Sequence, residues 1–121
     1  MLGYFDHNQL FVDLEISGSF PEKKTIIKAH IDTGYDGELT LPFSLAFPLG
    51  LILTGANTYT IADGSSMTNF SCLGQTKIAG KLKPIFIDII PNGDVLLGLP
   101  LLEKLGNEIQ INFPKKQIKF T

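Results

Sequence analysis

Cysteine is almost absent from this sequence of 121 residues, which contains only Cys72. A single cysteine cannot form a disulfide within the chain, and it excludes a metal site built mainly from cysteines. Cys72 lies in the segment 68–73, whose pattern predicts a β-strand. We therefore expect a buried and unreactive thiol.

Charge of either sign is scarce and nearly balanced. Ten lysines and arginines stand against twelve aspartates and glutamates, so the formal net charge is −2. The lysines are scattered along the chain and form no basic stretch that would bind a polyanion. We expect neither a nucleic-acid partner nor a membrane partner.

Long hydrophobic runs are also missing. The richest apolar segment, 39–53, is interrupted by Pro42, Pro48 and Gly50, whereas a membrane helix needs about 20 apolar residues. The first residues lack the charged and apolar regions of a signal peptide. With 44% hydrophobic and 18% charged residues, we expect one globular domain over 1–121, soluble and cytoplasmic.

Short alternating segments separated by turn residues predict a mainly β fold. We expect strands at 10–16, 25–31, 38–42, 58–61, 67–73, 77–80, 84–90, 95–98, 108–113 and 117–120. A short helix is expected from Pro100 to the residue before Gly106, with three leucines on one buried face. The segment 43–49 allows one helical turn, which Pro48 limits.

The segment Ala29-His30-Ile31-Asp32-Thr33-Gly34 combines a strand end with an Asp-Thr-Gly turn. Asp32 follows the β-branched strand directly, and Gly34 accepts backbone dihedrals that are closed to other residues. A carboxylate in this position can approach a ligand closely. The alternative is that Asp32 only forms an Asx-type turn, which such sequences do in many proteins.

A second motif, Val95-Leu96-Leu97-Gly98, lies later in the chain and shortly before the expected helix. Together with Ala29-His30-Ile31-Asp32-Thr33-Gly34, and in this order of strands, it resembles the single-lobe aspartic proteases of the retropepsin-like family. Asp32-Thr33-Gly34-Tyr35 is similar to the prokaryotic members whose motif is Asp-Thr-Gly-Phe. The resemblance covers nearly the whole chain. It implies an all-β fold, a closed acid-protease β-barrel with one short C-terminal helix.

The resemblance implies an aspartic endopeptidase, and the chemistry of that reaction needs two carboxylates. One must be ionised to accept a proton from water, while the other donates a proton to the scissile carbonyl. Asp-Thr-Gly occurs once here, so the pair requires a homodimer with one Asp32 from each copy. The family assigns Thr33 to hydrogen bonds across the two-fold axis and Gly34 to contact with substrate backbone. No cofactor is expected.

The resemblance also implies a peptide-binding cleft covered by a flap. The hairpin 58–72, with Asp63-Gly64 at its tip, would close over a peptide or protein substrate. Asp36 would hold the substrate backbone, and Tyr59 is a candidate hydrogen-bonding residue of the flap. Tyr35 stands where viral relatives have a small residue, so it must reshape or fill the neighbouring pocket.

The pattern departs from the viral enzymes at Gly98. Leu99-Pro100 follow this glycine, whereas the viral enzymes have an arginine that pairs with the acid corresponding to Asp36. The flap tip also has a single glycine, Gly64. These differences leave two alternatives open.

One alternative is a catalytically inactive protease-like module that binds peptides or dimerises. The other is a small metal-dependent hydrolase that uses His30 with Asp32, two residues apart on one strand face. No third metal ligand is near in sequence, and the other histidine, His7, lies in a segment expected to be flexible.

Overall fold

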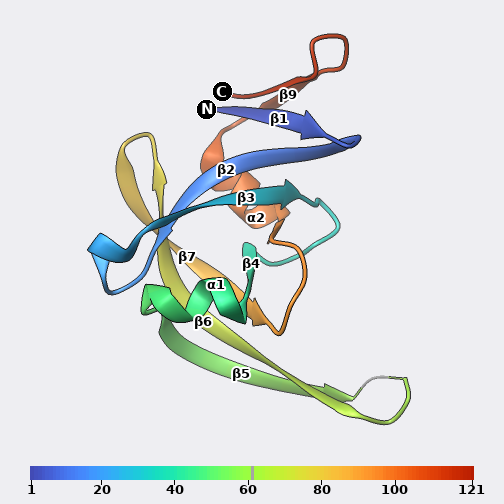
Figure 1. The fold of residues 1–121 in the computed structure, drawn as a ribbon. Helices are drawn as coiled ribbons and strands as arrows, with labels where there is room; N and C mark the ends of the chain where they lie inside the picture. The colour runs from blue at the N-terminus through green and yellow to red at the C-terminus, as the bar shows by residue number, and fades with distance from the viewer. Residues whose placement is uncertain (61) are drawn as a thin grey trace.

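One continuous, strongly curved sheet forms the body of the protein (Figure 1). The computed structural model describes residues 1–60 and 62–121, and it describes Pro21 and Tyr59 by their backbone only. The strands are β1 (Leu2–Asp6), β2 (Gln9–Ser17), β3 (Thr25–Ile31), β4 (Leu39–Pro42), β5 (Ile52–Thr60), β6 (Ser66–Ile78), β7 (Lys81–Ile90), β8 (Leu96–Leu97), β9 (Ile109–Asn112) and β10 (Gln117–Phe120). Their order in the sheet is β5-β6-β7-β4-β8-β3-β2-β1-β10-β9.

Short helical segments connect the strands. They are η1 (Pro21–Lys23), α1 (Phe43–Ala46), η2 (Phe47–Leu49) and α2 (Leu99–Leu105). The expected C-terminal helix is α2, and Leu101, Leu102 and Leu105 are its buried face, as predicted. In the described residues, no helix has the length and apolar character needed to cross a membrane.

The core follows from alternation along the central strands. Val12, Leu14 and Ile16 of β2 are almost fully buried, while Asp13 between them is exposed, because successive side chains of a strand point to opposite faces. Cys72 is buried in the same core. Burial raises the pKa of the Cys72 thiol, which agrees with the expected unreactive cysteine.

The sheet curls until β6 meets β2. This seam consists of the residue pairs Ile16↔Thr76 and Ser17↔Gln75, and the fully buried Thr76 donates its hydroxyl hydrogen to the Glu15 carbonyl at 3.0 Å. The expected all-β class is confirmed. The expected closed barrel is not fully formed, because β6 and β2 meet only over this short seam.

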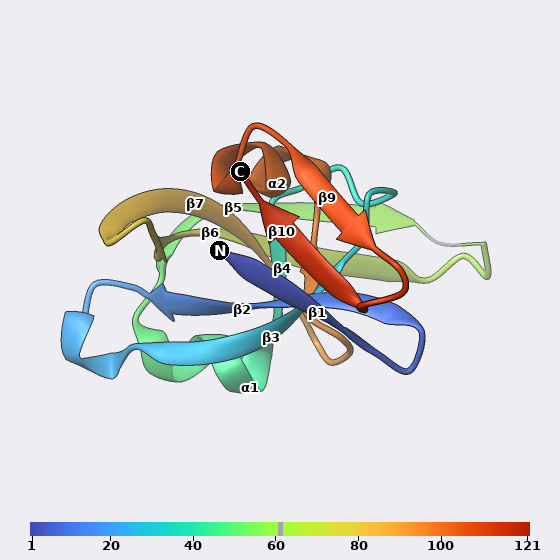
Figure 2. The same ribbon diagram turned by 90° about the horizontal axis from the view of Figure 1, so that it is seen from above.

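The N-terminal segment is a strand, which corrects the expectation of a flexible start. β1 and β2 form a hairpin whose turn residues, His7 and Asn8, have positive φ values of 48° and 62°. β1 also pairs with β10, so the two chain ends lie side by side (Figures 1 and 2). β9 then forms the outer edge of this part of the sheet.

β5 and β6 form a long hairpin that extends from the body (Figure 1). We call it the flap hairpin, Ile52 to Ile78. Only its inner part is flanked by β7, whose pairing with β6 begins at Phe70↔Ile89. The hairpin is longer than the sequence indicated, and the expected separate strand 77–80 is the end of β6 followed by a turn.

Candidate active site

Asp32 lies at the carboxyl end of β3, where parallel pairing with β8 fixes the backbone. The Asp32 N–H donates a hydrogen bond to the Leu97 carbonyl at 2.9 Å, and the His30 N–H donates to the Val95 carbonyl at 2.8 Å. The two segments that the sequence singled out are therefore neighbouring strands. Their contact holds the start of the Asp-Thr-Gly turn rigidly.

The turn itself orients the Asp32 carboxylate. The Gly34 N–H donates to Asp32 Oδ1 at 2.9 Å, and the Tyr35 N–H donates to the Asp32 carbonyl at 3.1 Å. This is the geometry of an Asx-type turn, and it also fixes one carboxylate oxygen. Asp32 is half-buried, whereas Thr33 and Gly34 are exposed at the surface. The turn can therefore present the carboxylate to a ligand or to another protein copy.

Gly98 packs directly under this turn. Its N–H donates to the Glu38 carbonyl at 2.9 Å. A Cβ atom at Gly98 would lie 2.6 Å from the Tyr35 carbonyl oxygen and would overlap the Gly37 carbonyl. Only glycine leaves the room for this approach, because the facing atoms are backbone.

The Tyr35 side chain extends from the turn towards β7. Its hydroxyl donates a hydrogen bond to Asp88 Oδ2, and Ser71 of β6 donates its hydroxyl hydrogen to Asp88 Oδ1 at 3.1 Å. Burial of the ring, followed by the hydrogen bond and negative charge of Asp88, raises the pKa of Tyr35 far above its ordinary value. The Tyr35 hydroxyl therefore stays protonated and remains a donor.

A buried glutamate near this loop forms an ion pair with a half-exposed lysine of α2. Glu38 is 9% exposed, its Oε1 accepts the Phe86 N–H at 2.9 Å, and its Oε2 lies 2.6 Å from Lys104 Nζ on α2. This pair connects the loop after the turn to α2. The arginine of the viral pattern is missing after Gly98, and Lys104 is the cation that reaches this loop from the same helix.

A surface cavity of about 670 Å³ opens beside the loop. Asp36, Gly37 and Asp88 contribute to its lining, together with residues of α2. Asp36 is exposed there. Asp32 lies outside this lining, so the cavity adjoins the turn without containing its carboxylate.

The flap hairpin carries the remaining predicted binding residues at its far end. Asp63 Oδ1 accepts hydrogen bonds from the Ser65 N–H at 2.8 Å and the Ser65 hydroxyl at 2.6 Å, and these bonds lower the pKa of Asp63. Gly64 has a φ of +87°, a conformation that favours glycine. Asp63 and Gly64 thus form the expected turn. The Tyr59 side chain lies outside the described part of the chain.

His30 packs against its neighbour in the sheet. Its ring lies 5.3 Å from the ring of Phe11, centroid to centroid. Among the described residues, no group of three or more histidine, cysteine, aspartate or glutamate side chains is placed to hold a metal ion. The geometry gives the metal-hydrolase alternative no third ligand in that part of the chain.

Sequence reasoning missed Asp88, Ser71, Glu38 and Lys104. Asp88 is half-buried on β7 and accepts two hydroxyl hydrogen bonds. One signal was available, because Asp88 lies within the apolar segment 84–90, and a carboxylate in a buried strand needs hydrogen-bond partners. The identity of those partners depends on long-range contacts.

The strand order and the placement of the Asp-Thr-Gly turn define the class of fold as that of the retropepsin-like acid proteases. Among the solved structures that share it are two viral proteases. The EIAV protease complexed with the inhibitor HBY-793 superposes with a TM-score of 0.60 and 17% identity, over 84% of this chain and 92% of that chain. The simian foamy virus (mac) protease in solution gives a TM-score of 0.55 and 17% identity, over 78% of this chain and 94% of that chain.

Comparisons of sequence, by contrast, found no match. No protein-family model matches the chain, and no curated protein sequence matches it. At 17% identity the likeness to the two viral proteases concerns the fold.

Proposed function

We propose that this protein is an aspartic endopeptidase whose catalytic pair consists of Asp32 from each of two copies. The observation that supports this proposal most directly is the position of the Asp32 carboxylate. It lies on an Asp-Thr-Gly turn at the end of β3, which hydrogen bonds with Leu97 and Gly34 hold in place. The surrounding fold is shared with two viral proteases. We also propose that the chain belongs with the prokaryotic retropepsin-like proteases whose motif is Asp-Thr-Gly-Phe.

The proposed reaction uses one proton shared by two carboxylates. Two aspartates within hydrogen-bond distance cannot both ionise, so one is protonated and the other is charged. The charged Asp32 accepts a proton from water as that water attacks the scissile carbonyl, and the protonated Asp32 donates its proton to the carbonyl oxygen. Gly34 and Asp36 would hold the substrate backbone, and Thr33 would bond across the two-fold axis.

The shape of the chain supports assembly on one side. In Figures 1 and 2 the loop after β3, the far end of the flap hairpin and the turn between β9 and β10 all point to the same side of the molecule. A second copy on this side would bring the two turns together. The flap hairpin, with Tyr59, Asp63 and Gly64, would then cover an extended peptide and exclude water.

The decisive experiment compares Asp32→Asn with the parent protein on an unfolded protein substrate at acidic pH. Loss of a general acid-base group lowers the rate by about 10²–10⁴-fold, and circular dichroism should show an unchanged fold. Asp94→Asn is the matched control, because the Asp94 side chain is exposed on the turn before β8. A statine-type transition-state analogue should inhibit the parent enzyme.

Equal turnover by Asp32→Asn contradicts the proposal. Peptide binding without cleavage at any pH would instead support the alternative of an inactive peptide-binding or dimerisation module. The Asx-type turn of Asp32 and the engaged Tyr35 side chain are compatible with that alternative.

A further inference from the structure

Tyr35 follows the Asp-Thr-Gly turn directly, and its ring lies in a space cleared by two glycines. A Cβ atom at Gly37 would overlap the Tyr35 hydroxyl, and one at Gly98 would lie 2.9 Å from Cδ2 of the ring. The ring is therefore enclosed on two sides by atoms of the same loop and of the segment after β8. From this position its hydroxyl reaches Asp88.

Asp88 connects the tyrosine to the flap hairpin. Asp88 and Ser71 are direct partners in the β6–β7 register, and the Ser71 hydroxyl donates to the second carboxylate oxygen of Asp88 at 3.1 Å. The Ser71 carbonyl in turn accepts the Thr54 hydroxyl at 3.0 Å. Thr54 lies at the irregularity in β5 between Leu53 and Gly55. Both strands of the flap hairpin are thus connected to Asp88 at their base.

Each carboxylate oxygen of Asp88 accepts a hydrogen bond from a different hydroxyl group, Oδ2 from Tyr35 and Oδ1 from Ser71. The contact between Tyr35 and Asp88 is also half-buried, where water competes less for the same groups. The arrangement is therefore specific in geometry as well as favourable.

We propose that Tyr35 is a positioning residue, which holds the Asp32 turn in register with the base of the flap hairpin through Asp88 and Ser71. Its effect on catalysis rests on the proposed endopeptidase function, whereas the mechanical link does not. Tyr35 acts through Asp32, because its own N–H closes the turn on the Asp32 carbonyl at 3.1 Å. A displaced Tyr35 moves the carboxylate that must meet its symmetry mate.

The first test is Tyr35→Phe, which removes one hydroxyl and keeps the ring. A misplacement of about 1 Å at a reacting group costs on the order of 10²-fold in rate, so we expect kcat to fall by about 10- to 100-fold. KM should change much less, because the substrate-facing backbone remains. Ser71→Ala should produce the same kind of change, and the double variant should lose less than the product of the two effects because both act through Asp88.

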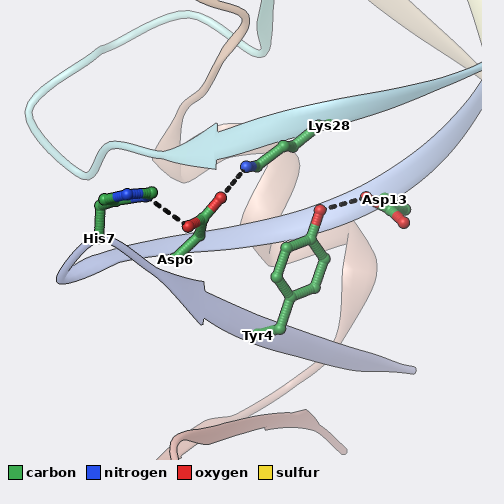
Figure 3. Close-up of polar contacts among 5 residues, drawn as sticks. All are labelled: Tyr4, Asp6, His7, Asp13 and Lys28. Atoms are coloured by element: carbon green, nitrogen blue, oxygen red, sulfur yellow. Dashed lines mark hydrogen bonds and ion pairs between the residues drawn. The ribbon is translucent and has the colours of Figure 1, made fainter.

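The chain provides a matched control for the loss of a Tyr–Asp hydrogen bond. Tyr4 on β1 donates its hydroxyl hydrogen to Asp13 Oδ1 at 2.6 Å, on an exposed strand face that also carries the Asp6–Lys28 pair (Figure 3). Tyr4→Phe removes the same type of bond away from the Asp32 turn. We expect Tyr4→Phe to leave kcat and KM unchanged.

Conservative rescue separates a positioning role from simple packing. Asp88→Asn keeps a carbonyl oxygen that can accept the Tyr35 hydrogen, whereas Asp88→Leu keeps only volume. We expect kcat to be higher in Asp88→Asn than in Asp88→Leu. Equal kcat in the two variants, or a Tyr35→Phe enzyme within twofold of the parent, overturns the proposal.

Amide hydrogen exchange tests the link without any activity. In Tyr35→Phe, the amides of residues 32–37 and those of residues 70–73 should both exchange faster than in the parent protein. In Tyr4→Phe, the same amides should exchange at the parent rate. Unchanged exchange at 70–73 overturns the proposal even when the parent enzyme is active. If the parent protein cleaves no substrate, the endopeptidase proposal fails, and coupled exchange would still support the link.

Discussion

At the scale of single residues, Gly98 places the strictest steric demand on the candidate site. Its φ of −89° is open to any residue, so the demand comes from contact with the Tyr35 and Gly37 carbonyl groups. Overpacking against backbone costs about 1–3 kcal/mol, and we expect Gly98→Ala to lower the free energy of unfolding by that amount in urea denaturation. Gly55→Ala is the control, because no atom lies within 4 Å of its added Cβ. Equal effects of the two substitutions would contradict this account.

The Glu38–Lys104 pair supports a second prediction at this scale. Lys104→Met leaves a buried carboxylate with the Phe86 N–H as its main partner. An unpaired buried charged group costs about 1–3 kcal/mol or more, so the urea midpoint should fall clearly. Lys24→Met removes a pair with Glu15 at 3.7 Å that is more exposed than Glu38–Lys104, and surface pairs contribute about 0–1 kcal/mol. Similar losses in both variants would show that Glu38 tolerates its burial without Lys104.

The sequence predicts the place of Asp32 and not that of its supporting residues. Alternation in 25–31 and the following Asp-Thr-Gly define the turn locally, so short-range reasoning suffices for it. Tyr35 and Asp88 are separated by 53 positions, and no periodicity connects them. Their hydrogen bond arises because β4 and β8 place the loop after β3 close to β7. Such partners depend on tertiary packing.

At the scale of elements, the outer and inner parts of the flap hairpin differ in how many strands flank them. Residues 66–69 of β6 pair with β5 alone, whereas residues 70–73 pair with both β5 and β7, and residues 75–76 pair with β7 and β2. Strand segments with few neighbours open locally at low free energy. We expect amides of 57–60 and 66–69 to exchange roughly tenfold or more faster than those of 72–76, measured by NMR. Uniform exchange along β6 would contradict this division.

The extent of the flap hairpin shows where prediction by pattern fails. The sequence indicated strands at 58–61 and 67–73, and the structure has β5 from Ile52 and β6 to Ile78. Gly55 and Gly74 weaken the local strand signal. The strands nonetheless pack closely at Gly74, where an added Cβ would lie 2.8 Å from the end of the Ile87 side chain. Close packing between strands, which local propensity does not describe, sets the element's length.

At the scale of the whole molecule, β9 is an unpaired edge of the sheet in the described structure. Ile109 and Ile111 on this edge are 37% and 36% exposed, and β10 occupies the other side of β9. An exposed edge with apolar side chains favours pairing with another chain. If the proposed homodimer forms, we predict that β9 contributes to the contact between its two copies.

The proposed activity of a dimer depends on protein concentration. Because each copy provides one Asp32, the rate per molecule should fall with dilution below the dimer dissociation constant. Ile111→Lys places two lysines near the axis, and like charges at an interface cost several kcal/mol. We expect the dimer Kd to rise by at least about tenfold, since each 1.4 kcal/mol is a factor of ten. Analytical ultracentrifugation and activity at a series of concentrations measure both quantities.

The control for this substitution is Ile26→Lys, which changes an isoleucine of β3 that is 71% exposed and lies away from β9. It should leave both the Kd and the activity unchanged. The activity lost in Ile111→Lys should return at high protein concentration, because mass action restores the dimer without altering Asp32. A monomer that is fully active at every concentration would contradict the shared catalytic pair, since one copy would then supply the whole reaction.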